Sequence, residues 1–165
     1  MIISNSHKFL YVAIPKTGTH AIREAIRPHL QKGDWEQCNL YETKILPFIE
    51  LAVKKHGHFS TKEIKPFIGD EKFNDYTKFA FVRNPWDRFV SYCSFINRGS
   101  DRFQKNPQKV MEQTIFNPKQ LTRLLLKPQH TFITNVQGEV NVDIVGRHET
   151  FTESFNEICN RIGIP

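Results

Sequence analysis

The stretch YVAIPKTGTH, residues 11 to 20, joins an apolar run to a loop of proline, lysine, glycine and two threonines. The apolar run belongs to a predicted buried strand over residues 8 to 14, and a helical pattern begins at residue 19. A helix N-terminus presents unpaired N–H groups and partial positive charge, and anionic ligands bind there in open α/β sheets. The stretch therefore predicts a strand, a phosphate-binding loop and a helix, with an ordinary strand-to-helix turn as the alternative.

The composition is that of an ordinary globular protein. The chain has 165 residues, a net charge of +6 and no internal repeat, so we expect one domain over residues 1 to 165. The charge favours anionic partners such as nucleotides, acidic glycans or nucleic acid, or it reflects a solvated basic face.

Cysteine spacing and hydropathy indicate the cellular compartment of the protein. Cys38, Cys93 and Cys159 lack metal-ligand spacing, so we expect neither a zinc site nor a disulfide framework. No apolar run could span a bilayer, and no signal-peptide pattern opens the sequence. These features predict a cytoplasmic protein without a membrane span.

A second strand and helix repeat the first arrangement further along the chain. Residues 77 to 83 form an apolar run that ends on Arg83, and Asn84 followed by proline is typical of a helix start. Arg83 and Ser91 can then meet at the mouth of the same sheet as Lys16. Two separated anion sites imply a ligand with two phosphates. The Walker A spacing is absent, which disfavours a kinase-like NTPase.

The remaining segments carry shorter patterns. Residues 33 to 43 are irregular, whereas residues 45 to 55 and 100 to 127 have helical tendencies. Capping-box patterns precede two further helices, and short strands are expected around a glycine turn. The capping pairs are Ser60 with Glu63 and Thr150 with Glu153, and the strands cover residues 130 to 134 and 140 to 147.

The two loops resemble those of a known family. IPKTGT, residues 14 to 19, looks like the 5'-phosphosulfate loop of sulfotransferases, and FAFVRNPWDRFVSY, residues 79 to 92, looks like their 3'-phosphate-binding strand, turn and helix. The resemblance continues through KHGHFSTKEI, residues 55 to 64. It also includes residues 142 to 164, which are similar to the carbohydrate-directed branch.

The resemblance implies a P-loop NTPase-like α/β fold, a three-layer parallel sheet flanked by helices. It implies that 3'-phosphoadenosine-5'-phosphosulfate (PAPS) gives its sulfuryl group, without a metal, to an acceptor hydroxyl that is expected to be on a carbohydrate, and that 3'-phosphoadenosine 5'-phosphate is left. Lys16 would then neutralise the leaving group. Arg88 is either a ligand contact or structural. The implied donor-binding residues are Lys16, Thr17, Gly18, Thr19, His20, Arg83 and Ser91.

Sulfuryl transfer to an alcohol also needs a base. His58 stands first in the family pattern H-x-[ST]-x-x-E, and its imidazole titrates near neutral pH, so we predict that it is the base. His56 would be a helper or an acceptor contact, and the pair resembles that of heparan sulfate 2-O-sulfotransferases. His148 is expected to be a surface or structural residue, and Glu149 at most a supporting one.

Alternatives to this enzyme stay open. A catalytically inactive module that binds PAPS or its product is the first, and the presence of both Lys16 and His58 favours the enzyme over it. A nucleic-acid binder is disfavoured because no known module pattern is present. The family continues with further helices past the final GIP, so the domain is either naturally short or incomplete. Basic residues between Arg98 and Arg123 face an acidic acceptor or solvent.

Overall fold

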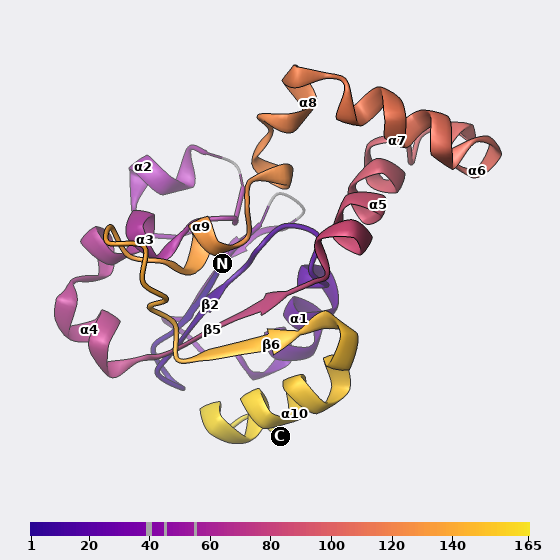
Figure 1. The fold of residues 1–165 in the computed structure, drawn as a ribbon. Coiled ribbons are helices and arrows are strands. Elements are labelled where there is room, and N and C mark those ends of the chain that lie inside the picture. The colour runs from indigo at the N-terminus through magenta and orange to yellow at the C-terminus, as the bar shows by residue number, and fades with distance from the viewer. Residues whose placement is uncertain (39–40, 45, 55) are drawn as a thin grey trace.

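The computed structural model describes residues 1–38, 41–44, 46–54 and 56–165, with the backbone alone for residues 38 and 41–44. Within this part of the chain, six strands form one sheet in the order β4-β3-β1-β2-β5-β6 (Figure 1). The strands are β1 (Ile2–Ser4), β2 (Phe9–Val12), β3 (Trp35–Cys38), β4 (Tyr41–Lys44), β5 (Thr77–Val82) and β6 (Ile144–Arg147). Strands β2, β5 and β6 are parallel, whereas β1, β3 and β4 extend the sheet in antiparallel pairs.

Helices cover both faces of the sheet. One face packs against α1 (Thr19–Ile26) and α10 (Phe151–Ile162), and α10 lies below β6 in Figure 1. The other face packs against α2 (Ile49–Ala52), α3 (Thr61–Ile68), α4 (Asp70–Asp75) and α9 (His130–Ile133). The predicted three-layer α/β architecture is therefore confirmed, with an antiparallel extension that the sequence did not indicate.

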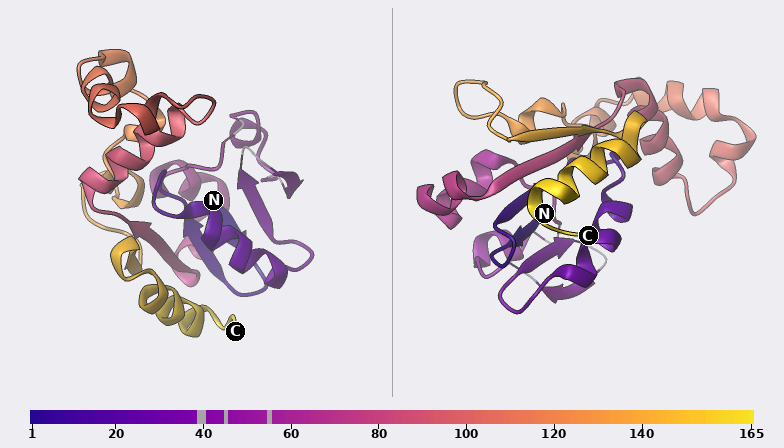
Figure 2. Two further views of the ribbon diagram at one scale, coloured as in Figure 1. Left: turned by 90° about the vertical axis from the view of Figure 1, so that its right-hand side faces the viewer. Right: turned by 90° about the horizontal axis from the view of Figure 1, so that it is seen from below.

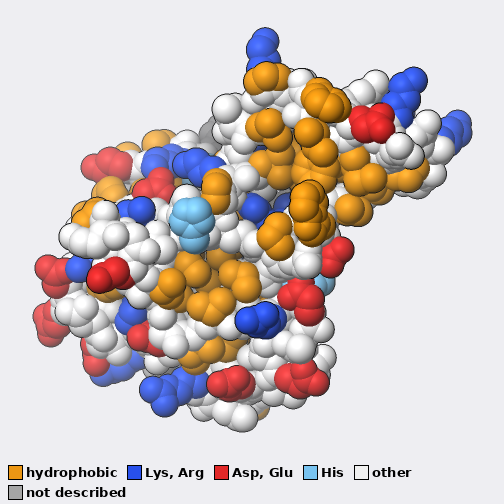
Figure 3. Space-filling view, in the orientation of Figure 1, with side chains coloured by type: hydrophobic (Ala, Val, Ile, Leu, Met, Phe, Trp, Pro, Cys, Tyr) orange, Lys and Arg blue, Asp and Glu red, His pale blue; other side chains and the backbone are white. Residues whose placement is uncertain are grey.

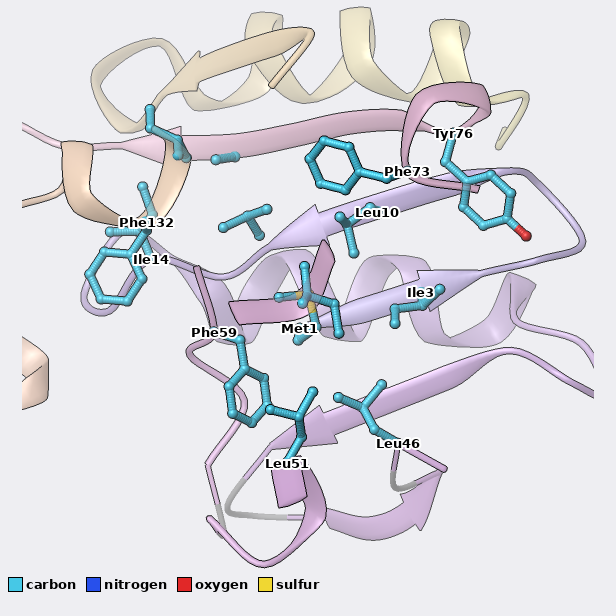
Figure 4. Packing of buried hydrophobic residues seen from close by; sticks show 14 residues of the cluster. Met1, Ile3, Leu10, Ile14, Leu46, Leu51, Phe59, Phe73, Tyr76 and Phe132 are labelled. Atoms are coloured by element: carbon cyan, nitrogen blue, oxygen red, sulfur yellow. The ribbon is translucent and has the colours of Figure 1, made fainter. Parts of the chain in front are cut away.

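The two faces follow from the alternation of side chains along each strand. On β2, Phe9 and Tyr11 belong to the core under α1 and α10, whereas Leu10 and Val12 belong to the opposite core. Figure 4 shows this second core, where Phe59 and other side chains from helices and loops meet those of the strands. Because β2 is fully buried on both sides, it has the continuous apolar sequence of a central strand.

A helical arm leaves the sheet after β5. It consists of α5 (Pro85–Ile96), α6 (Arg102–Lys105), α7 (Pro107–Ile115), α8 (Pro118–Leu121) and the short 3₁₀ turn η2 (Leu124–Leu126), and it projects from the body (Figure 2). Its helices pack around a small core of their own, built on Tyr92, Cys93 and Val110. Residues 100 to 127 therefore belong to this helical arm and not to the layers that cover the sheet.

The sequence predicts that residues 33 to 43 are irregular. This prediction is wrong for the residues of β3 and β4, which are strands. Residues 39 and 40 lie outside the described part. Glu36 and Gln37 are buried in β3 because distant groups satisfy them. The Glu36 carboxylate accepts two hydrogen bonds of 2.8 Å from the Arg27 guanidinium. The Gln37 amide donates to the carbonyls of Leu51 (2.8 Å) and His56 (2.9 Å).

Of two other local predictions, one is wrong and one is confirmed over a shorter range. Residues 130 to 133 form α9 instead of a strand, because the Pro128 carbonyl accepts from the Thr131 hydroxyl at 2.7 Å and begins a helical turn. The predicted helix over residues 45 to 55 is confined to α2, and residues 45 and 55 lie outside the described part.

The capping predictions have mixed outcomes. The box of Ser60 and Glu63 is confirmed at the start of α3, and Asn84 caps α5. No side chain caps α10, because the Thr150 hydroxyl lies 3.2 Å from the Ser154 hydroxyl instead.

Two further expectations concern thiols and membranes. Cys93 and Cys159 are free and buried, and the Cys38 side chain lies outside the description. Among the described residues, no helix has the length and apolar character needed to cross a bilayer.

Candidate functional site

The PKTGT loop lies between β2 and α1, at the carboxyl end of a parallel strand. Lys16 and Gly18 both have left-handed backbones, with φ of 67° and 86°. Gly18 is the N-cap of α1, and no side chain caps this helix. The first N–H groups of α1 are therefore directed at the loop without a side-chain acceptor, an arrangement suited to a bound anion.

Gly18 is required by its surroundings as well as by its backbone. A Cβ atom at this position would lie 3.2 Å from the Phe151 ring and 3.3 Å from His148. Both residues belong to the corner between β6 and α10. This corner therefore covers one side of the PKTGT loop, and a side chain at Gly18 would require Phe151 or His148 to shift as well as a strained backbone.

The other polar residues of the first loop lie in different environments. Thr17 is fully buried and its hydroxyl donates to the Ile14 carbonyl at 2.9 Å, so the hydroxyl stabilises the loop itself. Thr19 is half-buried at the first position of α1. His20 is exposed, and its Nε2 lies 3.2 Å from the Glu24 carboxylate on the next turn.

The second loop follows β5 and is held by Gln129. The Gln129 amide accepts from the Arg83 N–H (2.9 Å) and donates to the Arg83 carbonyl (2.7 Å). The Nε of Arg83 is buried without a hydrogen-bond partner among the described residues. Ser91 is half-buried on α5, two turns further on. A buried guanidinium nitrogen without a partner is costly, which indicates a site for an anionic acceptor.

Arg88 of α5 joins this helix to the first loop and to the end of the helical arm, and it is structural. Its Nε donates to the Pro15 carbonyl at 2.8 Å, and its two terminal nitrogens donate to the carbonyls of Lys127 (3.0 Å) and Leu125 (2.9 Å). Burial lowers the pKa of this guanidinium to about 10. Its three nitrogens donate to backbone carbonyls of the protein itself. Of the two roles that the sequence left open for Arg88, ligand contact or structural residue, the structure therefore favours the second.

Lys16 lies among cations and against an aromatic ring. Its Nζ is 4.1 Å from the centre of the Phe95 ring, and the Arg98 guanidinium is 4.4 Å from the same centre. Burial, followed by repulsion from Arg83 and Arg98, lowers the pKa of Lys16 to about 8. The two loops and the end of α5 thus concentrate positive charge at one edge of the sheet.

The predicted base lies beside the first loop. The Nδ1 of His58 is 2.7 Å from the Ala13 carbonyl, at the end of β2, and a carbonyl can only accept. Nδ1 therefore carries the hydrogen, and Nε2 keeps its lone pair. Burial lowers the pKa of His58 to about 3, although the bond to Ala13 opposes this shift.

His56 has the opposite arrangement. Its Nδ1 accepts from the backbone N–H of His58 at 3.3 Å, so its Nε2 is a donor in the neutral ring. The two rings stack at 6.5 Å, and burial lowers the pKa of His56 as well. Gly57 between them lies against β3, where an added Cβ atom would be 1.6 Å from the Gln37 carbonyl oxygen.

Comparison with known proteins identifies the chain. The model of the sulfotransferase family matches residues 1–165. The chain belongs to the sulfotransferase family. An uncharacterized protein of Archaeoglobus fulgidus is 27% identical over 103 residues, which cover 62% of this chain and 80% of the relative. No solved structure matches the chain.

The corner between β6 and α10 adds to the candidate site two residues for which the sequence predicted no ligand contact. His148 packs over Gly18, and its pKa is lowered by burial and then by Arg83. Glu149 accepts from the Asn84 N–H at 2.6 Å, so the β6–α10 corner touches both loops. The sequence did contain a signal for this corner, because GRHET, residues 146 to 150, follows a strand-like run just as the two loops follow theirs. Nothing in the local sequence indicated that the Gln129 amide would hydrogen-bond the backbone of Arg83.

Proposed function

We propose that this sulfotransferase-family protein transfers the sulfuryl group of PAPS to a hydroxyl of a carbohydrate acceptor, with residues 1–165 acting as one domain. The observation that carries the proposal is the convergence of two loops suited to anions at one sheet edge, where the parallel strands β2 and β5 both end. The uncapped start of α1 suits one phosphate, and the unpartnered Arg83 Nε suits another.

The residues present fit a donor with separated 5'- and 3'-phosphates. The backbone of Lys16 and Gly18 would hold the 5'-phosphate, with Thr19 and His20 near it. Arg83 and Ser91 would bind the 3'-phosphate that distinguishes PAPS from ATP. Thr17 would contribute indirectly, by stabilising the conformation of the loop, because its hydroxyl already donates to the Ile14 carbonyl.

PAPS, when bound, supplies an activated sulfuryl group for in-line transfer to an alcohol. Lys16 would offset the negative charge that develops on the bridging oxygen as the S–O bond breaks. The lowered pKa of Lys16 fits this role, since an ammonium with a pKa of about 8 can also give a proton to that oxygen.

The tautomers of the two histidines support different roles. His58 would accept the acceptor's proton at Nε2, since Nδ1–H is bonded to Ala13 and keeps the ring in place. The depressed pKa of His58 keeps the imidazole neutral at pH 7, as a base requires. His56 would donate from Nε2 to the acceptor, because its Nδ1 is used by the His58 N–H.

A second candidate function is a module that binds the nucleotide without transferring sulfate. The observation that favours it is the His58 pKa of about 3, because so weakly basic an imidazole takes a proton with little driving force. The enzyme remains the better supported proposal, since a module that only binds the nucleotide would not need both Lys16 and an oriented imidazole pair beside it.

Calorimetric titration with adenosine 3',5'-bisphosphate, 5'-AMP and magnesium ATP tests the donor site. We expect micromolar affinity for the bisphosphate and much weaker binding of the other two. Preference for magnesium ATP, or no binding of the bisphosphate, would contradict the proposal.

Transfer of labelled sulfate from PAPS to a panel of sugars then separates enzyme from binding module. His58→Gln should keep bisphosphate binding and lose transfer, with His56→Gln as the matched variant. If His56→Gln alone loses transfer, the assignment of the base is wrong. If the wild type binds the bisphosphate and transfers to no sugar, the binding module is favoured.

A further inference from the structure

A cavity of about 380 Å³ lies in the helical arm, among α5, α6, α7 and α8. This volume is within the range of pockets that bind small ligands. The lining combines polar side chains with the apolar side chains of Ile96 and Val110. None of the lining residues belongs to the PKTGT loop or to the loop after β5, so the cavity is separate from the candidate site described above.

Three side-chain amides of the lining present donors. The Gln113 oxygen accepts from the Arg102 guanidinium at 3.2 Å, and the Gln120 oxygen accepts from the Tyr92 hydroxyl at 2.7 Å. The Asn117 oxygen caps the start of α8. The three amide nitrogens have no hydrogen-bond partner among the residues that the structure describes. Because an amide nitrogen only donates, all three suit a ligand with acceptor atoms.

Two guanidinium groups give this cavity a positive charge. Arg102 and Arg123 both line it, and no carboxylate among the described residues does. Neither arginine forms an ion pair with the part of the chain that the structure describes. Arg123 lies near the Tyr92 hydroxyl, where its charge partly opposes the burial that raises the pKa of Tyr92.

Nearby acidic side chains are engaged elsewhere. Asp101 pairs with Lys105 one turn along, and the Glu112 carboxylate accepts from Gln108 at 3.0 Å. Lys and Arg side chains also stand along the outer edge of the arm in Figure 3. An anion that enters the cavity therefore meets guanidinium donors without a carboxylate partner.

Acceptors are fewer than donors in this lining. The Asn97 amide nitrogen donates to the Cys93 carbonyl at 2.8 Å, so only its oxygen is available to a ligand. The Thr114 hydroxyl donates to the Val110 carbonyl at 2.8 Å and keeps its lone pairs. A ligand rich in acceptors and poor in donors satisfies this lining best, which disfavours a neutral polyhydroxyl molecule.

The charge and the size of the cavity narrow the class of anion. A phosphate monoester carries about −1.5 to −2 charge at pH 7 and three strong acceptor oxygens, which matches two guanidinium groups and the amide donors. A sulfate monoester or a carboxylate carries a single charge. The cavity is larger than a phosphate group, and Ile96 and Val110 offer an apolar surface to the rest of the molecule.

We propose that this cavity binds a phosphate monoester with a small apolar body, at a site separate from the two loops. Arg102 and Arg123 bind the phosphate oxygens together with the amides of Gln113 and Gln120. The inference goes beyond the proposed function and does not rest on it.

Calorimetry with phenyl phosphate as the probe tests this site, with phenyl sulfate and inorganic phosphate for comparison. Phenyl sulfate has the same apolar body with a single charge, and inorganic phosphate has no apolar body. Adenosine 3',5'-bisphosphate is kept at saturation in these titrations, so that the proposed donor site is occupied and does not bind the probe.

The titrations are repeated on three variants. Arg102→Gln with Arg123→Gln removes both guanidinium groups. Gln113→Glu keeps the size of the side chain and gives Arg102 a carboxylate partner, so it tests anion binding without removing a cation. Lys119→Gln is the matched control, because Lys119 is an exposed cation on α8 outside the cavity.

We expect phenyl phosphate to bind at least tenfold more tightly than phenyl sulfate or inorganic phosphate. The double variant and Gln113→Glu should each lose about tenfold or more of that affinity, whereas Lys119→Gln should lose less than twofold. Equal affinity for the three anions, equal losses in all variants, or no binding of phenyl phosphate would overturn the inference.

Failure of this inference is distinguishable from failure of the proposed function. If the wild type binds the bisphosphate but not phenyl phosphate, the cavity site alone is refuted. If the wild type does not bind the bisphosphate, the donor site is refuted, and the titrations without bisphosphate decide the cavity. Loss of phenyl phosphate binding in Arg83→Ala, with binding retained in the double variant, would place the probe at the second loop and refute the cavity site.

Discussion

Arg88 offers the sharpest test of how α5 is held to the first loop and to the end of the helical arm. Replacing it with lysine keeps the positive charge but leaves one donor nitrogen in place of three and removes the planar fork. The ammonium can replace one of the three bonds to Pro15, Lys127 and Leu125, so two are lost. A hydrogen bond to a charged group contributes about 1.5–3 kcal/mol. The low end applies, because the Lys127 and Leu125 carbonyls are only partly buried.

The expected loss is about 3 kcal/mol in the free energy of unfolding, since two bonds contribute about 1.5 kcal/mol each. For a chain of this size, each kcal/mol changes Tm by about 2–4 °C, so Arg88→Lys should lower Tm by about 6–12 °C. Thermal unfolding followed by circular dichroism measures this. Arg161→Lys, an exposed arginine on α10, is the matched control and should stay within about 2 °C.

The reasoning is refuted if Arg88→Lys lowers Tm by less than about 2 °C, or if both variants lose equally. A ligand role for Arg88 would give a different result. The melting temperature would then stay near that of the wild type while the affinity for adenosine 3',5'-bisphosphate fell.

Three further outcomes are expected. Gly57→Ala should cost about 3 kcal/mol in urea unfolding, since its Cβ would be 1.6 Å from the Gln37 carbonyl oxygen, and a loss under about 1 kcal/mol would contradict this packing. Arg83→Ala should weaken adenosine 3',5'-bisphosphate binding by about 30-fold or more and 5'-AMP binding little, whereas equal losses would exclude the 3'-phosphate as its partner. Because Lys16 has a pKa of about 8, it loses its charge as pH rises through that value, so bisphosphate affinity should fall above pH 8. Lys16→Arg should flatten this profile, and a flat wild-type profile would contradict the role of Lys16.

Local sequence patterns were sufficient for the parallel part of the fold. The apolar runs of β2 and β5, the glycine in the first loop and Asn84 before α5 specify strand, turn and helix through short-range sterics and capping. The same signals placed Lys16 and Arg83 at strand ends. Parallel pairing of β2 with β5 then brings those ends to one edge.

The antiparallel extension had no comparable signal. β3 contains Glu36 and Gln37, and polar residues in sequence predict solvent exposure. Their burial depends on Arg27 and on the carbonyls of Leu51 and His56, which the folded chain supplies. Segment 130–133 was misassigned for a related reason, since its β-branched residues match a strand while the turn at Pro128 begins α9.

The sequence alone determined that two strand-loop-helix units carry a lysine and an arginine where their strands end, because those features depend on neighbours along the chain. Only the tertiary structure decided what each polar group does once placed. Arg88 binds the carbonyl of Pro15, 73 residues earlier, and His148 covers Gly18 from a third strand. Partners so far apart in the chain produce no periodic pattern in the sequence. A hydrogen bond between them depends on atomic positions that only the packing of the whole chain creates.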